Sequence, residues 1–316
     1  MTDDDSSRFA LHRERLQQRA ALLARLRAFF AARGFVEVAT PLLCDEVIPE
    51  LHIEPIAVEG RWLQASPELS MKRLLAEGMP AIVQIGPAFR RGEYGRLHNP
   101  EFTMVEWYRV GDDFVAGVSL LAELCRELLG GDVPITQTAY ADALATHAGI
   151  DPHQASLAEL ARASERLAVV VPADMPEDRD EWLNLLLAAA VEPRLGAAGP
   201  EILCDYPPSQ AALAATRIDP QGNVVAERFE LYWRGVELAN GYHELTDGTE
   251  LRRRFEEVNA RRVADGRAAL PLPEKFLAAH ARLPPCSGCA LGFDRLAMLA
   301  SGAGSIAEVM TFAWEE

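Results

Sequence analysis

The hydrophobic pattern near the start of the chain changes from a helical period to a strand period. Residues 11–33 repeat apolar positions at helical spacing, at Leu16, Leu23, Leu26, Phe29 and Phe30. Gly34 follows at the position where a glycine commonly ends a helix. A strand is predicted next over residues 35–38, ending before Thr40 and Pro41.

A second helix is predicted to start at residues 66–68. Ser66 is a favoured N-cap residue, Pro67 suits the first helical position, and Glu68 complements the positive end of the helix dipole. Gly78 closes this helix after Glu77. Residues 81–85 then form a strand that leads into a hairpin.

The rest of the pattern predicts an α+β fold. Residues 112–195 are mostly helical, with helices over 118–129, 157–167 and 181–191, and we interpret this region as a helical insertion. Strands follow at 201–206 and 224–238, helices at 250–265 and 273–281, and a glycine-rich strand-to-helix junction at 286–301. The Asn240-Gly241 pair is typical of a turn. Because no repeat or linker separates these elements, residues 1–316 are predicted to form a single domain.

The hairpin at residues 88–108 carries charge where packing alone would seldom place it. Side chains alternate between the two faces of a strand, so Phe102, Glu106 and Tyr108 share one face. A buried carboxylate is costly without a partner. Together with Arg90 and Arg91 in the preceding strand, this face predicts a binding site for charged groups.

Composition narrows the class of protein. A chain of 316 residues, 49% of them hydrophobic, is long enough for a large core. The acidic start, the lack of a long apolar run and five scattered cysteines predict a cytoplasmic protein with no membrane association. The net charge of -16 disfavours broad nucleic-acid binding, because phosphate contacts need lysine and arginine.

Three glutamates, Glu230, Glu237 and Glu244, recur at intervals of seven residues. On an uninterrupted strand an odd interval would place neighbours on opposite faces, but a turn at Arg234-Gly235 would restore a common face. Converging carboxylates need cations, which suggests Mg²⁺ held together with nucleotide phosphates. The alternative is three carboxylates exposed to solvent.

The junction at residues 287–295 combines two glycines with an arginine. Gly288 and Gly292 allow a ligand to approach the backbone closely, and Arg295 adds a positive charge to the first turn of the following helix. Helix N-termini attract anions, so this corner suits a phosphate.

At this point the chain resembles the class II aminoacyl-tRNA synthetases, in particular their lysyl branch. Residues 34–41 resemble motif 1, residues 89–108 motif 2 and residues 288–295 motif 3, and residues 235–247 are similar to the lysyl form. The resemblance implies the catalytic fold of that class, a mostly antiparallel sheet flanked by helices. It also implies ATP and Mg²⁺ as cofactors and a homodimer formed through motif 1.

The arrangement of the motifs departs from lysyl-tRNA synthetases. Motif 1 is complete by Pro41 and few residues follow Arg295, so we expect no anticodon-binding domain, which would need a five-stranded barrel. In this respect the chain is similar to a paralogous branch that attaches (R)-β-lysine to a lysine of translation elongation factor P. The resemblance thus implies elongation factor P as protein substrate and (R)-β-lysine or lysine as amino acid.

The resemblance also implies roles for individual residues. Arg90 and Arg295 are the expected catalytic residues, Arg90 at the α-phosphate and substrate carboxylate and Arg295 at the γ-phosphate. Phe102 is expected to stack on adenine, and the other expected nucleotide contacts are Arg91, Gly92, Glu93, His98, Asn99, Glu237, Leu238 and Gly292. Glu230 and Glu237 are the expected Mg²⁺ ligands. The expected diamino-acid pocket comprises Ser66, Pro67, Glu68, Glu106, Tyr108, Asn240, Glu244 and Ala290.

Two positions differ from the synthetase pattern. Gly92 stands where motif 2 usually has a glutamate that meets adenine, and Glu93 or backbone groups could take its place. Ala290 stands where lysyl-tRNA synthetases have glycine. It either reshapes the pocket toward a β-amino acid or is an innocuous methyl group, since one methyl shifts discrimination by about 1 to 3 kcal/mol.

These features predict a two-step ligation. The amino-acid carboxylate attacks the α-phosphorus of ATP, and a lysine amine of the acceptor protein then displaces AMP from the acyl-adenylate. One alternative is a minimal lysyl-tRNA synthetase-like enzyme that acylates tRNA, although its acidic charge means that tRNA is not expected. Another is a non-catalytic regulatory paralogue, which would have no use for the full set of Arg90, Glu230, Glu237 and Arg295.

Overall fold

A computed structural model describes residues 3–130 and 133–314, and these residues confirm the predicted α+β fold. The chain divides into two compact units. The first comprises Met1–Gly111, Glu127–Leu129 and Thr246–Glu316, and the second comprises Asp112–Arg126 and Gly130–Leu245. Whether residues 1–316 form a single domain with a helical insertion at 112–195 stays a prediction. In the described ranges, no helix is both long and apolar enough to span a membrane.

The first unit combines a sheet with five helices among its described residues. Its helices are α1 (Asp3–Ala31), α2 (Glu68–Ala76), α7 (Gly248–Ala264), α8 (Glu274–His280) and α9 (Phe293–Ala300), with a 3₁₀ turn at Ile306–Glu308. Its main strands are β1 (Val36–Glu37), β5 (Ala81–Phe89), β6 (Glu101–Val110) and β12 (Cys286–Gly292). A small separate sheet contains β2 (Leu43–Cys44), β3 (Ala57–Val58) and β4 (Arg61–Leu63).

The predicted hairpin is the centre of the main sheet in this unit. Strands β5 and β6 pair in antiparallel fashion, and β12 pairs with the other edge of β6. The short strand β1 is parallel to β5. The first unit therefore has the strand order β1-β5-β6-β12, with the arginine-bearing loop at one end of the hairpin.

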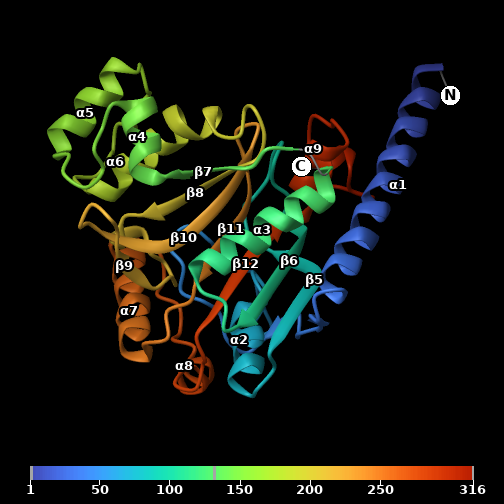
Figure 1. Cartoon of the computed structure of the whole chain (residues 1–316), viewed down its shortest axis with the longest axis horizontal. Helices are drawn as coiled ribbons and strands as arrows, with labels where there is room; N and C mark the ends of the chain where they lie inside the picture. The colour runs from blue at the N-terminus through green and yellow to red at the C-terminus, as the bar shows by residue number, and fades with distance from the viewer. Residues whose placement is uncertain (1–2, 131–132, 315–316) are drawn as a thin grey trace. The chain divides into compact units, whose positions relative to one another are not determined.

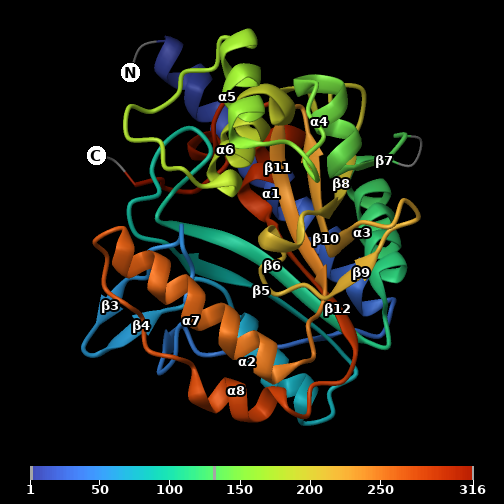
Figure 2. The ribbon, with the colours of Figure 1, turned by 90° about the vertical axis from the view of Figure 1, so that its left-hand side faces the viewer.

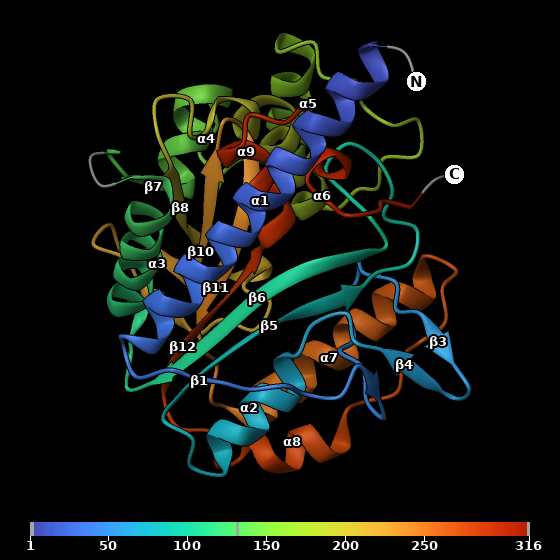
Figure 3. The ribbon, with the colours of Figure 1, turned by 90° about the vertical axis from the view of Figure 1, so that its right-hand side faces the viewer.

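The two faces of β6 are covered by different helices. On one face, Met71 and Leu75 of α2 belong to the same buried cluster as Tyr108. On the other face, Phe30 of α1 packs against Trp107, with ring centroids 5.2 Å apart. Figure 3 shows the C-terminal end of α1 beside the hairpin, and Figures 2 and 3 both show α2 beside α8. This packing fixes which side chains of β6 face α2, and Glu106 is among them.

Helix α2 begins one residue later than predicted. Pro67 occupies the N-cap position, so the prediction of Ser66 as N-cap was wrong. The Ser66 hydroxyl still accepts a hydrogen bond from the backbone N–H of Glu68, over 3.0 Å. The helix ends at Ala76, and Gly78 follows with a left-handed φ of 103°, as the sequence predicted.

The second unit carries the helical region. Its helices are α3 (Phe114–Leu129, with its last turn in the first unit), α4 (Tyr140–Ala148), α5 (Leu157–Arg166) and α6 (Arg179–Leu186), followed by a π-helical turn (Leu187–Val191) and 3₁₀ turns (Glu192–Arg194, Pro208–Gln210). Its strands are β7 (Thr136–Ala139), β8 (Glu201–Tyr206), β9 (Thr216–Ile218), β10 (Val224–Trp233) and β11 (Val236–His243). Figure 1 shows α4, α5 and α6 grouped beside β7 and β8.

The strands of the second unit are ordered β11-β10-β8-β7, with β9 on β10. The pairs of β10 with β8, β9 and β11 are antiparallel, and β7 is parallel to β8. The segment predicted as one strand, residues 224–238, is two strands joined by the predicted Arg234-Gly235 turn. The prediction of a turn at Asn240-Gly241 was wrong, because both residues lie inside β11.

A buried arginine supports the motif 2 segment in the first unit. Arg262 of α7 is completely buried and donates to the carbonyl oxygens of Glu50 (2.8 Å) and Ala268 (3.1 Å) and to the Glu54 carboxylate (2.8 Å). The carbonyl of Glu54 in turn accepts from the backbone N–H of Arg91, over 2.9 Å. Arg262 thus connects α7 to the segment that carries the predicted nucleotide contacts.

We predict that Arg262→Met lowers the free energy of unfolding by about 3 kcal/mol, because buried carbonyl groups and a carboxylate lose their donor. Urea denaturation measures this change. Arg252→Met is the matched control, since Arg252 pairs with Glu274 on the exposed side of the same helix, and its denaturation midpoint should barely move. Equal midpoints for the two variants would contradict the structural role of Arg262.

Candidate active site

Glu106 is a buried carboxylate in the middle of β6. It lies opposite Gln84 of β5 and Ala290 of β12, and only 1% of its surface is exposed. The Tyr108 hydroxyl donates to one carboxylate oxygen over 2.6 Å, and the Ser66 hydroxyl donates to the other over 2.8 Å. The predicted pocket residues Ser66, Glu106 and Tyr108 therefore form one hydrogen-bonded group.

The surroundings of Glu106 change its acidity. Burial, followed by the nearby charge of Glu68, raises the pKa of Glu106 to about 8, although the two hydroxyl donors and Lys72 oppose this shift. Glu106 is therefore largely protonated at neutral pH. A cation placed beside it would favour its ionised form and would release a proton.

Glu68 has a buried partner that the sequence reasoning missed. Lys72 is 2% exposed, and its ammonium lies 2.5 Å from the Glu68 carboxylate one helical turn away. The same ammonium lies 5.6 Å from the ring centroid of Tyr108. The i,i+4 spacing of an acid and a lysine was the available signal. Nothing in the sequence indicated that the lysine is buried.

Small residues of β12 face the pocket side of β6. Gly288 lies opposite Tyr108, Ala290 opposite Glu106 and Gly292 opposite Met104. Ala290 is only partly buried. Because the β12 residues on this face are glycine or alanine, the carboxylate of Glu106 has no bulky neighbour on β12. The methyl group of Ala290 is the nearest cross-strand side chain on that edge.

Arg90 and Phe102 lie together at the loop end of the hairpin. The guanidinium carbon of Arg90 is 5.1 Å from the Phe102 ring centroid, and Nη1 is 3.8 Å from the Glu93 carboxylate. Its Nε atom is buried and has no hydrogen-bond partner among the described residues. A buried donor without an acceptor is costly, so this atom suits an anionic ligand.

Gly92 has a conformational reason to be glycine. Its φ of +78° lies in the left-handed region, where side chains other than glycine are strained. A glutamate at this position would therefore need a different loop backbone. Glu93, which points its carboxylate toward Arg90, is the acidic residue that this loop provides, and Arg91 beside it is exposed.

Arg295 meets His98 at the start of α9. Its Nη2 lies 2.7 Å from the Nε2 atom of His98, and its Nε donates to the Leu97 carbonyl over 3.2 Å. Desolvation, followed by the charge of Arg295, lowers the pKa of His98. A neutral His98 can accept from the guanidinium, which holds Arg295 in place without cancelling its charge.

Asn99 is engaged by the chain itself. Its amide donates to the Glu101 carbonyl over 2.5 Å and accepts from the backbone N–H of Trp314 over 2.8 Å. The Trp314 ring lies 6.4 Å from that of Tyr94, beside a cavity of about 270 Å³. The sequence reasoning missed this link between the motif 2 loop and the C-terminal segment.

In the second unit, the turn between β10 and β11 brings Glu230 and Glu237 to one face. Arg234 and Gly235 both have positive φ values, 52° and 72°. Glu237 consequently lies opposite Tyr232, which is two residues from Glu230 and shares its face. The turn corrects the odd interval as the sequence predicted.

A β-bulge corrects the second odd interval, from Glu237 to Glu244. The register shifts so that Leu231 lies opposite Ala239, and Leu238 becomes an extra residue in β11. Asn240 then lies opposite Glu230. Glu244 follows Asn240 at an even interval, so the alternation of side chains places it on the same face. Without this bulge, Asn240 and Glu244 would face away from the two other glutamates.

Glu230 is buried within a network of donors. The hydroxyls of Tyr206 and Tyr232 donate to its carboxylate over 2.5 and 2.7 Å, and the Arg228 guanidinium also binds it. Burial, followed by the charge of Glu230, raises the pKa of Tyr206 well above its usual value, so this phenol stays a donor. The sequence reasoning missed Arg228 and both tyrosines.

The face of β10 and β11 that carries Glu230 and Glu237 suits a metal ion whose remaining ligands are oxygen atoms of a bound substrate. Two carboxylates, Glu230 and Glu237, lie on this face. The buried Oδ1 of Asn240 beside them has no hydrogen-bond partner in the described part of the chain and is an acceptor for a separate, ammonium-bearing ligand. No group of three His, Cys, Asp or Glu side chains placed to hold a metal occurs within residues 3–130 and 133–314. Mg²⁺ is commonly held by one or two carboxylates plus substrate phosphates. Glu230 accepts from three donors, and a carboxylate has roughly four acceptor sites, so one site remains for an ion beside Glu237.

Known proteins place these observations in a family. The family described as tRNA synthetases class II (D, K and N) matches residues 6–316. The elongation factor P–(R)-beta-lysine ligase of Klebsiella pneumoniae is 42% identical over 308 residues, which cover 94% of this chain and 94% of that protein. Proteins of the same name from Salmonella dublin and Salmonella paratyphi B show the same identity and coverage. The chain therefore belongs to the class II tRNA synthetase family of the D, K and N type.

Proposed function

We propose that this chain is an ATP-dependent, AMP-forming ligase. It activates (R)-β-lysine or lysine as an aminoacyl-adenylate and transfers the aminoacyl group to a lysine side chain of translation elongation factor P. The proposal is supported by the relatives that are named for this reaction and are 42% identical to the chain. The observation that carries it is Glu106, a buried carboxylate poised to ionise beside a cation, with Glu68 close to it.

The proposed roles in the first unit follow from charge and exposure. Phe102 stacks on adenine, and Arg90 directs its open Nε at an oxyanion of the α-phosphate or the amino-acid carboxylate. Arg295, held by neutral His98, binds the γ-phosphate. Fixed positive charges of this kind stabilise the charge that develops on a transferring phosphoryl group.

The proposed roles in the second unit concern the ion and the amino acid. Glu230 and Glu237 hold Mg²⁺, which when bound neutralises phosphate charge. The buried acceptor of Asn240 and the carboxylate of Glu244, which is 2% exposed, bind an ammonium group of the substrate. A diamino acid carries two ammonium groups, so a pocket with one carboxylate for each ammonium matches its charge.

In the first reaction step, a carboxylate oxygen of the amino acid bonds to the α-phosphorus while the bond to pyrophosphate breaks. In the second step, the neutral ε-amine of the acceptor lysine bonds to the acyl carbon while AMP leaves.

We propose that the methyl group of Ala290, opposite Glu106, favours the shifted amino group of β-lysine over that of lysine. The remaining proposed nucleotide contacts are Arg91, Gly92, Glu93, Asn99, Leu238 and Gly292, and the remaining pocket residues are Ser66, Pro67 and Tyr108.

We also propose a homodimer that forms through motif 1. The apolar side chains of Val36 in motif 1 and of Leu42 and Leu43 just after it are 47%, 40% and 40% exposed, and a partner subunit would cover them. We further propose that the protein is cytoplasmic and that its acceptor is elongation factor P rather than tRNA.

Two assays test the function. Pyrophosphate exchange with (R)-β-lysine and with lysine reports the adenylate step, and we expect exchange with at least one of them. Mass spectrometry of elongation factor P after incubation with the chain, ATP and the amino acid should show one added aminoacyl group. No exchange with any amino acid would exclude a ligase, and acylation of tRNA alone would exclude the protein acceptor.

We predict that binding of (R)-β-lysine at pH 7 releases a proton from Glu106, because a substrate ammonium lowers the raised pKa of this carboxyl. Affinity should increase as pH rises toward about 8, where the ionised form of Glu106 becomes the majority. Titration calorimetry in buffers of different ionisation enthalpy measures the proton release. Glu106→Gln should abolish the release and weaken binding roughly 30-fold or more.

Glu101→Gln is the matched control for this experiment, since Glu101 is an exposed glutamate of the same strand. Its proton release and affinity should equal those of the wild type. Unchanged proton release in Glu106→Gln would mean that another group titrates. The same raised pKa affects stability. Between pH 5 and pH 8 the free energy of unfolding of the wild type should fall more than that of Glu106→Gln, because ionisation of the buried carboxyl favours the unfolded chain.

We predict that Glu237→Gln raises the Mg²⁺ concentration needed for half-maximal pyrophosphate exchange by roughly tenfold or more, because one carboxylate ligand is lost. Magnesium titrations of the exchange rate measure this shift. Glu165→Gln, on the exposed side of α5, should leave the titration unchanged. The same Mg²⁺ dependence in Glu237→Gln and wild type would remove Glu237 from the ion site.

A further inference from the structure

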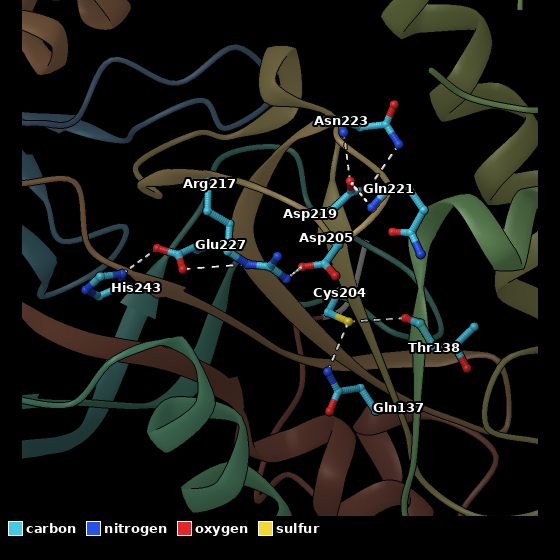
Figure 4. Close-up of polar contacts among 10 residues, drawn as sticks. All are labelled: Gln137, Thr138, Cys204, Asp205, Arg217, Asp219, Gln221, Asn223, Glu227 and His243. Carbon is cyan, nitrogen blue, oxygen red and sulfur yellow. Dashed lines mark hydrogen bonds and ion pairs between the residues drawn. The ribbon is translucent and has the colours of Figure 1, made fainter. Parts of the chain in front are cut away.

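A chain of alternating charges crosses the second unit and has no role in the proposed reaction. Its members are His243 of β11, Glu227 of β10, Arg217 of β9 and Asp205 of β8, one from each of four strands (Figure 4). His243 Nδ1 lies 2.5 Å from Glu227 Oε2, Arg217 Nε lies 3.7 Å from Glu227 Oε1, and Arg217 Nη2 donates to Asp205 over 2.6 Å.

This charge chain lies behind the ligand-binding face of β11. Side chains alternate along a strand, so His243 points to the opposite face from Tyr242 and Glu244. All four side chains of the charge chain are only partly exposed, between 14% and 32%. At this burial, interactions between charges are screened less than on an open surface.

Strands β10 and β11 separate at this point. Their regular pairing ends at Arg228 and Tyr242. Beyond it Ala215 lies between the two strands, because it accepts from the N–H of Glu227 over 2.8 Å and donates to the carbonyl of His243 over 2.9 Å. Glu244 therefore lies past the end of the ladder, with a single bridge to Ala214. The side-chain bond between His243 and Glu227 spans the same separation.

The far end of the charge chain is held under backbone strain. Asp205 has a φ of +61°, a conformation in which residues other than glycine are uncommon. Arg217 binds Asp205 and also lies 5.4 Å from the ring centroid of Phe114. A strained residue persists only where its surroundings hold it, which indicates that the position of Arg217, and with it of Glu227, is well defined.

Charged groups near His243 come from several elements. Glu227 of β10 binds it, Asp113 at the start of α3 and the neighbouring residue Glu244 add negative charge, and Arg217 of β9 lies behind Glu227. The hydrogen bond to Glu227 is the largest influence, and together with these negative charges it raises the pKa of His243. His243 is then positively charged and ion-paired with Glu227 at lower pH, and it loses its positive charge as pH rises through the raised pKa.

We propose that His243 is a positioning residue for amino-acid recognition. Paired with Glu227, it fixes the end of β11 where the ladder has stopped, and so sets Glu244 on the opposite face toward the substrate ammonium. This inference rests on the proposed function for the role of Glu244. It adds to that function a residue that touches neither substrate nor nucleotide.

A double-mutant cycle tests the inference with the dissociation constant of (R)-β-lysine, measured by calorimetry at pH 6.5. His243→Gln and Glu227→Gln should each weaken binding roughly 3- to 10-fold, and the double variant should be no weaker than the poorer single one, because paired residues are non-additive. The dissociation constant of ATP should stay within about 2-fold in all variants. His147→Gln, a histidine of α4 in the same unit, should bind as the wild type does.

The pH dependence of amino-acid binding distinguishes a positioning role of His243 from a general loss of packing in the His243→Gln variant. The ratio of the His243→Gln and wild-type dissociation constants should be largest at low pH and fall toward one above the raised pKa of His243. His243→Lys, which keeps the positive charge, should bind the amino acid as the wild type does at low pH. Nuclear magnetic resonance should show His243 titrating at lower pH in Glu227→Gln.

The outcomes distinguish this inference from the proposed function. Wild-type binding of (R)-β-lysine without pyrophosphate exchange would overturn the ligase, while the binding ratios would still decide the role of His243. Unchanged binding in His243→Gln and Glu227→Gln would overturn the positioning role and leave the ligase intact. A wild type that binds no amino acid would overturn both claims. A His243→Gln variant that loses ATP binding and amino-acid binding equally would overturn the positioning role alone.

Discussion

The burial of carboxylates inside a sheet is the constraint on which the candidate site depends. Glu106 and Glu230 each lie in the middle of a strand and are nearly inaccessible to water. Each accepts a hydrogen bond from a tyrosine two residues further along its own strand, Tyr108 for Glu106 and Tyr232 for Glu230. A second hydroxyl, from Ser66 or Tyr206, completes each arrangement. These donors replace the water that burial removes.

The two carboxylates differ in the charge beside them. Glu230 is bound directly by Arg228, two residues earlier in the strand. The corresponding position before Glu106 is Met104, and the nearby lysine, Lys72, is bound to Glu68 instead. Glu106 therefore keeps a raised pKa and can respond to an incoming cation. Similar strand chemistry thus yields one carboxylate that is paired with an arginine and one that can gain charge.

Contacts between distant segments hold the loops that carry the other site residues. Arg262 and Glu54 link α7 to the backbone of Arg91, and Asn99 binds the backbone of Trp314. Loops gain precision from such contacts, because their own backbones leave few hydrogen bonds to fix them. The motif 2 loop is therefore supported from two sides of the first unit.

Local rules of the backbone allowed the sequence alone to determine much of this protein. The alternation of side chains placed Glu106 and Tyr108 on one face, and the Arg234-Gly235 pair predicted the turn that aligns Glu230 with Glu237. Motif resemblance gave the fold and the family. The bulge at Leu238, the burial of Lys72 and the engagement of Asn99 by Trp314 followed only from the tertiary structure. A bulge depends on how two strands pair, and burial and long-range hydrogen bonds depend on segments far apart in the chain, so no local pattern encodes them.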